Sequence, residues 1–329
     1  MRIAVDAMGG DDAPGVVVEG AIESLPSLGG CDLILVGMRD QIEEAAHVLG
    51  GLPPHIEVVH ASQVVLMDDK PTEALRRKRD SSIARCVDLV ADGEADALVS
   101  AGNTGAVVAH ATLRLRLLEG VKRAGIAVDM PSLTGYTLVI DAGANVKCTP
   151  EHLYQYGVMA SAYAKDVYGR KHPKVGLLNI GEEETKGTAL VRQADDLFEN
   201  SSLNYIGYVE GRDVFTGVAD VVVCEGFVGN VLLKVSEGVA EAIFTMLKQA
   251  LQRTLRRRIG ARLVEYGLRE LAAKVDHSEH GGAPLLGVNG TCMIAHGGSN
   301  SRAIANAIRC AAEAAAYRVN EHIVAGLNP

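Results

Sequence analysis

Short apolar runs alternate with helix-length stretches along most of this chain, and this alternation constrains the fold more than any other feature. Apolar runs of strand length cover residues 2–7, 32–37, 56–60, 95–100, 126–130, 137–141, 174–180, 204–209, 219–224 and 291–295. Amphipathic or alanine-rich stretches cover residues 13–25, 40–49, 81–92, 105–119, 150–168 and 185–200. Such alternation predicts an α/β fold with a mostly parallel sheet and helices on both of its faces.

We expect a single α/β domain over residues 1–329. The 329 residues are 48% hydrophobic, enough to bury a large core, and no segment rich in proline and serine divides the chain. Residues 231–275 interrupt the alternation, because Val231, Val235 and Val239 begin a series with helical spacing. We therefore expect a helical excursion from the sheet at 231–275.

Capping residues indicate two helix starts. Thr149 precedes Pro150 and Glu151, so we expect Thr149 to be an N-cap with proline at the first helical position. Asp11 and Asp12 precede another proline. They could be metal ligands or an acid–base pair, but we favour a helix cap and a first-turn acid.

Charge and cysteine content narrow the class of protein. A formal net charge of −9 disfavours nucleic-acid binding, which needs a basic surface. The six cysteines include no C-x-x-C pair, which favours buried free thiols over a zinc ribbon or a disulfide framework. The sequence shows no apolar signal-peptide region and no apolar run of about 18 residues. We expect a cytoplasmic, soluble protein that binds no nucleic acid.

Glycine-rich loops with polar side chains follow six of the predicted strands. These loops cover residues 7–14, 101–105, 141–145, 179–187, 225–230 and 295–300. In open α/β sheets, ligands bind where the carboxyl ends of the strands meet, and backbone N–H groups at the following helix starts favour anions. The six loops therefore predict one shared crevice built from backbone N–H groups, amides and hydroxyls.

The residue types in these loops limit the chemistry. The dinucleotide, Walker, G-x-S-x-G and H-E-x-x-H motifs do not occur. His277 and His280 lack a third metal ligand at a recognisable spacing. Amides, hydroxyls and a lysine can hold a tetrahedral oxyanion, but no nucleophile with its base is evident. We expect a reaction whose nucleophile arrives already ionised, without a metal or another cofactor.

These loops closely resemble the signatures of the PlsX family of bacterial phosphate acyltransferases over essentially the whole chain. The matching segments, in chain order, are 1–12, 70–78, 100–105, 143–145, 176–181, 220–223, 226–231, 281–283 and 295–297. The resemblance implies a three-layer α/β/α fold, similar to isocitrate and isopropylmalate dehydrogenases and to phosphotransacetylases, assembled as a homodimer. It also implies that inorganic phosphate attacks a fatty acyl thioester of acyl carrier protein, giving acyl phosphate in phospholipid synthesis, with no covalent acyl-enzyme.

With this reaction in view, we assign Lys186, Asn230 and Asn103 to catalysis. Substrate binding falls to Gly102, Thr104, Gly105, Asn145, Gly181, His296 and Ser299. The alternative for each asparagine is a turn-forming side chain, and the alternative for Lys186 is a solvated partner of Glu182 or Glu183. Phosphate already carries negative charge, and a thiolate leaves readily, so the protein needs to supply no base.

A basic cluster lies in the predicted helical excursion. It consists of Arg253, Arg256, Arg257, Arg258 and Arg262. An acidic carrier protein and an anionic membrane surface would both be attracted to it, and a solvated helix face is the alternative. Peripheral contact with the membrane or with the downstream glycerol-phosphate acyltransferase is a related expectation.

Two other functions compete with carrier-dependent acyl transfer. One is another enzyme on the same architecture, such as a dehydrogenase or a coenzyme-A-dependent phosphotransacetylase. A dehydrogenase needs a dinucleotide fingerprint or metal-binding acids, and neither is visible. The other is a non-catalytic scaffold that binds carrier protein, which the presence or absence of phosphate-dependent product would decide.

Overall fold

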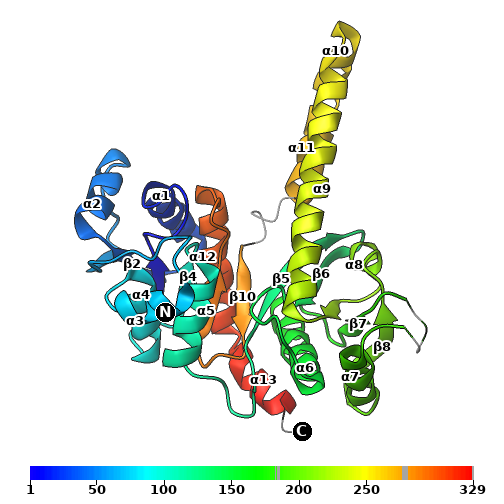
Figure 1. Cartoon of the computed structure of the whole chain (residues 1–329). Helices are drawn as coiled ribbons and strands as arrows, with labels where there is room; N and C mark the ends of the chain where they lie inside the picture. The colour runs from blue at the N-terminus through cyan, green and yellow to red at the C-terminus, as the bar shows by residue number, and fades with distance from the viewer. Residues whose placement is uncertain (182, 184–185, 276–280, 328–329) are drawn as a thin grey trace.

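A computed structural model describes residues 1–327 except 182, 184, 185 and 276–280. In this part of the chain the strands form one 11-stranded sheet with the order β3-β2-β1-β4-β11-β10-β5-β6-β9-β7-β8 (Figure 1). The strands are β1 (Arg2–Asp6), β2 (Asp32–Gly37), β3 (Ile56–His60), β4 (Ala97–Ser100), β5 (Gly125–Ser132), β6 (Gly135–Ile140), β7 (Lys174–Leu178), β8 (Asn204–Val209), β9 (Val221–Val223), β10 (Ala283–Leu286) and β11 (Thr291–Ile294).

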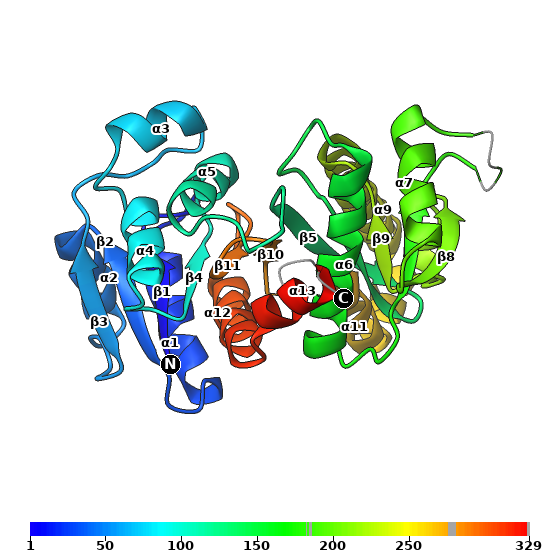
Figure 2. The ribbon, with the colours of Figure 1, turned by 90° about the horizontal axis from the view of Figure 1, so that it is seen from below.

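The pairing is mostly parallel, as the sequence predicts, and the antiparallel exceptions gather at the centre of the sheet. β10 pairs antiparallel with both β11 and β5, and β5 pairs antiparallel with β6. β10 therefore joins the half that holds β1 to β4 and β11 to the half that holds β5 to β9 (Figures 1 and 2). This continuous sheet supports the single-domain interpretation of residues 1–329, which stays a prediction.

Helices cover both faces of both halves. The helices are α1 (Gly15–Ser24), α2 (Arg39–Val48), α3 (Pro71–Arg77), α4 (Ser82–Ala91), α5 (Thr104–Arg114), α6 (Pro150–Val167), α7 (Ala189–Glu199), α8 (Asp213–Thr216), α9 (Gly226–Gln252), α10 (Leu255–Leu263), α11 (Glu265–Val275), α12 (Ser301–Ala316) and α13 (Val319–Leu327), with a 3₁₀ turn η1 (Leu25–Ser27). In the first half, α1, α2 and α12 cover one face, and α3 to α5 cover the other. In the second half, α6, α7 and α13 lie opposite α8 and the start of α9. The three-layer α/β/α fold is confirmed.

Local capping confirms one predicted helix start and corrects the other. The Thr149 side chain accepts a hydrogen bond from the backbone N–H of His152, and the His152 side chain accepts one from Thr149, forming a capping box. The prediction for Asp11 and Asp12 is wrong. α1 begins at Gly15 after Pro14, with no side-chain cap bond and no acid in its first turn. The Asp11 backbone N–H donates to Gly297 O instead, which ties this loop to the loop after β11.

The chain leaves the sheet along α9, which begins at Gly226, before the predicted start of the helical excursion at 231. α9 spans 27 residues and projects beyond the body, followed by α10 at the tip and α11, which returns toward the sheet (Figure 1). Its exposed apolar side chains include Val231, Val235, Val239, Ile243 and Met246. Among the described residues, none of the helices is both long and apolar enough to cross a membrane.

The close packing of α1 on α12 generates a stability prediction. A Cβ atom at Gly20 would lie 2.5 Å from the backbone oxygen of Ser301, so Gly20→Ala must push the two helices apart. We expect the free energy of unfolding to fall by about 1–3 kcal/mol. Gly267→Ala in α11, where the added Cβ meets open space, is the matched control and should be neutral or slightly stabilising. Urea denaturation measures both, and an equal midpoint for Gly20→Ala and the wild type would contradict the prediction.

Candidate active site

The loops after β1, β4 and β11 pack against one another at the carboxyl edge of the sheet. The Asp11 N–H donates to Gly297 O at 2.8 Å. Gly9 and Gly102 approach so closely that a Cβ atom at Gly9 would lie 2.6 Å from the Gly102 nitrogen. The glycines therefore permit backbone contact that other residues would prevent.

A cleft of about 800 Å³ opens between this edge and α9. Four predicted site residues from different elements line it: Thr104 of α5, Asn230 of α9, and His296 and Ser299 of the loop after β11. The remaining lining includes the apolar residues Ile126, Val128, Leu233, Ala240, Phe244 and Ile294. The lining residues of α9 extend from Asn230 to Lys248, which corresponds to roughly 27 Å of helix. The cleft is thus long, with polar groups at the strand ends and, along α9, apolar side chains interspersed with Lys234, Glu237, Glu241 and Lys248.

Asn103 lies beside this cleft, but its side chain is bound to the protein. Its Oδ1 accepts from the Ala106 N–H at 3.0 Å and caps α5. Its Nδ2 lies 3.2, 3.0 and 3.0 Å from the carbonyl oxygens of Leu66, Met67 and Asp69. Asn103 therefore positions the loop before α3, and in this structure its amide hydrogens are directed at backbone oxygens.

Asn145 is similarly engaged in the loop after β6. Its Nδ2 donates to Ala124 O at 2.6 Å and to the Tyr156 hydroxyl at 2.9 Å. Gly102 and Gly105, by contrast, flank Thr104 at the start of α5, next to the cleft. The predicted residues described so far thus fall into two groups. One group lines or borders the cleft, and the other, Asn103 and Asn145, holds the loops in place.

Two buried carboxylates, which the sequence analysis missed, hold the strand-end loops. Asp6 at the end of β1 accepts hydrogen bonds from the Ser100 hydroxyl at 2.7 Å and from the Met8 N–H at 3.1 Å. Asp141, directly after β6, accepts from the backbone N–H groups of Ile126, Gly143, Ala144 and Asn145. Burial raises the pKa of both carboxyls, and these hydrogen bonds oppose the shift. An aspartate at the end of an apolar run is the signal that could have revealed them.

Lys186 and Gly181 lie in the loop after β7 and are not among the residues that line the cleft. The Lys186 Nζ is 3.7 Å from Glu183 Oε2, and the Lys186 side chain is 49% exposed. This is the solvated pairing that the sequence allows as the alternative, whereas Glu182 lies outside the described residues. Lys186 would have to leave Glu183 to reach a ligand in the cleft.

His296 is an exposed residue of the cleft lining, and its Nδ1 accepts from the Gly298 N–H at 3.2 Å. His277 and His280, the two histidines considered as metal ligands, lie outside the described residues. Within the described ranges no group of three or more histidine, cysteine or acidic side chains could hold a metal ion.

A partly buried acid, Asp129 of β5, forms part of the cleft wall. The Tyr168 hydroxyl lies 2.6 and 2.7 Å from its two carboxylate oxygens. Burial raises the pKa of Asp129 to about 6, although the hydrogen bond from Tyr168 opposes that shift. Asp129 stands among apolar residues in the sequence, and nothing in that local pattern predicts that it lines the cleft.

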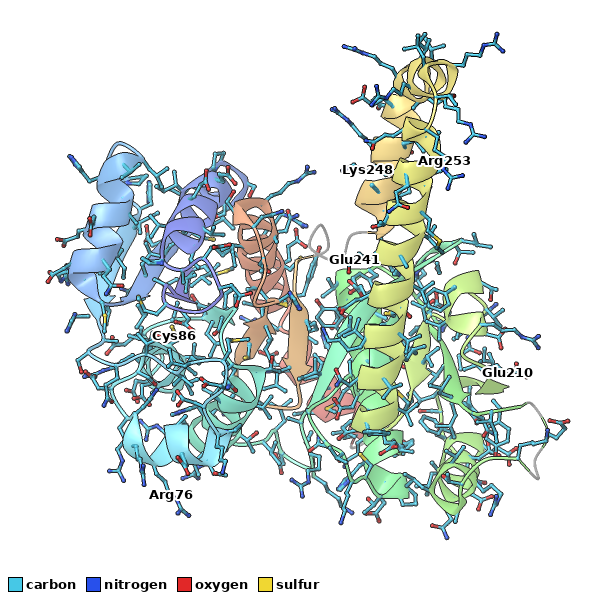
Figure 3. All side chains as sticks on the ribbon, turned by 45° about the horizontal axis from the view of Figure 1, so that its top comes forward. Arg76, Cys86, Glu210, Glu241, Lys248 and Arg253 are labelled. Atoms are coloured by element: carbon cyan, nitrogen blue, oxygen red, sulfur yellow. The ribbon has the colours of Figure 1, made fainter. Side chains whose placement is uncertain are left out.

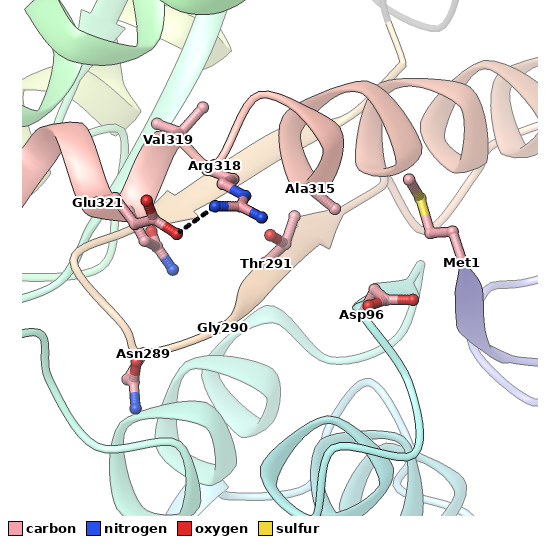
Figure 4. A pocket seen from close by; sticks show the side chains of 10 residues that line it. Met1, Asp96, Asn289, Gly290, Thr291, Ala315, Arg318, Val319 and Glu321 are labelled. Atoms are coloured by element: carbon pink, nitrogen blue, oxygen red, sulfur yellow. Dashed lines mark ion pairs between the residues drawn. The ribbon is translucent and has the colours of Figure 1, made fainter.

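A second pocket, of about 430 Å³, lies at the opposite edge of the sheet, near the amino ends of β1, β4 and β11 (Figure 4). Its Arg318 lies 3.6 Å from Glu321, so this cation is already paired. The pocket is remote from the glycine-rich loops, and we assign it no part in the reaction.

Comparison with solved structures identifies the fold. The fold is similar to that of a phosphotransacetylase from Streptococcus pyogenes, with a TM-score of 0.64, 18% identity, and coverage of 95% of this chain and 94% of that chain. It is also similar to a branched-chain phosphotransacylase from Enterococcus faecalis V583, with a TM-score of 0.57, 15% identity, and coverage of 95% and 98%. At these identities the likeness establishes the fold, which is that of the phosphotransacylases.

Sequence comparison identifies the family. The family described as "Fatty acid synthesis protein" matches residues 1–322. The chain is 50% identical to the phosphate acyltransferase of Geotalea daltonii over 326 residues, which cover 98% of this chain and 93% of that relative. It is 48% identical to that of Geobacter sulfurreducens over 325 residues, with the same coverage. The chain belongs to the fatty acid synthesis protein family of phosphate acyltransferases and is an acyl-group transferase, as the motifs predict.

Asp129 generates a prediction about pH. Its pKa of about 6 lies above the ordinary value of 3.8, so the folded protein retains a proton that the unfolded chain has lost between these pH values. The contribution of Asp129 to the free energy of unfolding therefore falls as the pH rises through this window and levels off above it. We expect Asp129→Asn to reduce that fall by about 1–3 kcal/mol.

Urea denaturation at pH 4.5 and at pH 7 measures this difference. Asp40→Asn, which changes an exposed carboxylate of α2, is the control and should leave the pH dependence as in the wild type. Parallel pH profiles for Asp129→Asn and the wild type would show that Asp129 does not carry the proton.

Proposed function

We propose that this chain transfers the fatty acyl group of acyl-[acyl-carrier protein] to inorganic phosphate in the cytoplasm, for phospholipid synthesis. A phosphate oxygen forms a bond to the thioester carbonyl carbon, and the resulting tetrahedral intermediate expels the carrier thiolate. The products are a fatty acyl phosphate and free carrier protein. The observation that carries this proposal is the cleft, which joins amide, hydroxyl and imidazole groups at the strand ends to a long apolar wall in a member of this family.

In this mechanism the protein binds two anions and supplies no nucleophile of its own. Phosphate is anionic at neutral pH, and a thiol with a pKa near about 8.5 leaves readily as thiolate. The side chains of Asn230, Thr104, Ser299 and His296 donate hydrogen bonds to phosphate and to the developing oxyanion. Gly102 and Gly105 let the substrate approach the backbone at the start of α5. We assign Asn103 and Asn145 a positioning role: their side chains hold these loops in place and do not contact the substrate.

Lys186 is the mobile cation of the proposed mechanism. Its present partner, Glu183, holds it at the long distance of 3.7 Å on an exposed loop, where an ion pair contributes little. A bound phosphate offers Lys186 two negative charges in a less solvated place, so we expect the Lys186 ammonium to exchange Glu183 for phosphate. The acyl chain would lie along the apolar part of the cleft, between α9 and the centre of the sheet.

We further propose a homodimer formed through α9. The side chains of Val231, Val235, Val239, Ile243 and Met246 are 45%, 58%, 52%, 54% and 59% exposed. Their helical spacing places them in one stripe, while the cleft-lining residues of α9 occupy another. A second copy of the chain would cover this stripe without obstructing the cleft.

The decisive experiment combines long-chain acyl-carrier protein, phosphate and this protein, and traps the product with hydroxylamine. Phosphate-dependent acyl hydroxamate would support the proposal. Product with acyl-coenzyme A alone would favour the phosphotransacetylase alternative, and binding of carrier protein without product would favour the scaffold.

The first mechanistic prediction concerns Lys186 and Asn230. Lys186→Ala removes a charge assigned to the transition state, so kcat/KM should fall by roughly 10²-fold or more. Asn230→Ala removes one neutral hydrogen-bond donor from the cleft. We expect kcat/KM to fall by less than in Lys186→Ala, about 10-fold or more. A change below about threefold for Lys186→Ala, in a variant with the wild-type melting temperature, would remove Lys186 from the mechanism. If Asn230→Ala altered thermal stability alone, Asn230 would return to a structural role.

The second prediction concerns the arginine cluster, which lies at the far end of α9, from Arg253 to Arg262 in α10 (Figure 3). Its position at the tip favours a peripheral contact with an anionic membrane, where the downstream glycerol-phosphate acyltransferase would take up the product. We expect replacement of Arg256, Arg257 and Arg258 by alanine to abolish sedimentation with anionic vesicles and leave kinetics in solution unchanged. A severalfold rise in the KM for acyl-carrier protein would instead assign the cluster to carrier docking. Unchanged behaviour in both assays would leave a solvated helix face.

A further inference from the structure

A second group of unpaired cations lies beside the cleft, in and around α3. Lys70, Arg76, Arg77 and Arg79 are exposed, and in the part of the chain that the structure describes none of them lies within ion-pair distance of a carboxylate. Their neighbours Lys78 and Arg85 are paired, with Asp69 and Asp80 respectively. The same segment exposes two apolar side chains, Leu66 at 57% and Met67 at 52%. We call Leu66, Met67, Lys70, Arg76, Arg77 and Arg79 the α3 patch.

The α3 patch is attached to the rim of the cleft by direct contacts. The side-chain amide of Asn103 binds the carbonyl oxygens of Leu66 and Met67, and Asn103 immediately precedes the cleft residue Thr104. Pro71, the first residue of α3, packs on Gly105, where a Cβ atom would lie 2.6 Å from the Pro71 Cγ. Helices α3 and α5 accordingly lie side by side in both views (Figures 1 and 2).

The α3 patch is also held in a fixed shape. The Lys78 ammonium donates to Val64 O at 2.8 Å and to the Asp69 carboxylate, which in turn accepts from the Leu66 N–H at 2.7 Å. These bonds close the loop before α3 on itself. These hydrogen bonds keep the segment in a fixed conformation. The segment carries four unpaired cations and only two exposed acids, Asp68 and Glu73.

We propose that the α3 patch is the docking surface for the acyl carrier protein, a deepening that rests on the proposed function. Carrier proteins of this kind are acidic and deliver the thioester on a flexible pantetheine arm. A partner bound at α3 would place that arm directly at Thr104 and the mouth of the cleft. Leu66 and Met67 supply apolar contact beside the charges, and Met67 reaches Gly297 of the loop that carries His296.

The arginine cluster of α10 is the competing surface, and its position argues against it within one chain. With a rise of about 1.5 Å per residue, α9 separates Asn230 from Arg253 by roughly 35 Å. Arg76 and Arg253 lie at opposite ends of the molecule (Figure 3). A carrier bound at α10 would hold its thioester far from the polar end of the cleft.

The test compares two donors that carry the same acyl chain: acyl-carrier protein and acyl-pantetheine, which has the arm but no protein. The variant Arg76→Glu/Arg77→Glu/Arg79→Glu should raise the KM for acyl-carrier protein about tenfold or more. Its kcat/KM for acyl-pantetheine and its KM for phosphate should stay within about twofold of the wild type. The matched control, Arg256→Glu/Arg257→Glu/Arg258→Glu, should leave all these constants unchanged in solution.

Three results would overturn the proposal while the proposed function stands: an unchanged KM for acyl-carrier protein in the α3 variant, an equal loss with both donors, or the loss in the α10 control instead. If the wild-type enzyme forms no acyl phosphate from acyl-carrier protein, the proposed function itself fails. Titration of holo-carrier protein against each variant gives a readout that does not depend on turnover. The milder Leu66→Ala/Met67→Ala variant should also weaken that binding, and tight binding by both α3 variants would refute the docking surface.

Discussion

The pairing of β10 with two neighbours is the constraint on which the rest of the structure depends. β10 has four residues, yet it hydrogen-bonds to β11 on one side and to β5 on the other and so makes one sheet of two halves. Glycines with positive φ stand at both of its ends, at Gly282 and Gly287. A Cβ atom at Gly282 would lie 2.9 Å from Ile294 O. Glycine at this position lets the chain approach β11 closely where β10 begins.

In each half of the sheet, a buried aspartate at or just after the end of a strand holds the strand-end loops in place: Asp6 in one half and Asp141 in the other. An isolated carboxylate in such a place would be costly, and burial does raise the pKa of both Asp6 and Asp141. Asp141 offsets that cost by accepting hydrogen bonds from four backbone N–H groups. Three belong to the successive residues Gly143, Ala144 and Asn145, and the fourth belongs to Ile126. The same bonds fix the backbone of the loop before any ligand arrives. Because these N–H groups donate to Asp141, their contribution is to the shape of the loop.

The sequence predicts what depends on local pattern and fails where contacts join distant residues. Ten of the strands and the Thr149 cap follow from periodicity and capping chemistry close to them in the chain. β10 escapes prediction because Ala-Pro-Leu-Leu between glycines has the composition of a loop, and only its two neighbours make it a strand.

The candidate site shows the same division. The glycine-rich loops predict the crevice, and Thr104, Asn230, His296 and Ser299 do come together there. The Asn103 amide binds carbonyl oxygens 34 to 37 residues away, and the Asn145 amide binds Ala124 O 21 residues away, so spacing could not show that these amides hold loops in place. The positions of Lys186 and Asp129 relative to the cleft likewise depend on tertiary packing. Their roles stay predictions.

Both proposed substrates are anions, while the chain itself carries a net charge of −9, so attraction has to be local. At physiological ionic strength, charges separated by more than about 8 Å of solvent are largely screened from each other. The cations of α3 lie on the segment that Asn103 and Pro71 join to the start of α5, beside the cleft. The cations of α10 lie beyond the end of α9, roughly 35 Å along that helix from Asn230, and so are screened from the polar end of the cleft. In our proposal the α3 cations therefore serve delivery of the acyl group to the cleft. The α10 cations instead meet whatever surface the projecting helices contact.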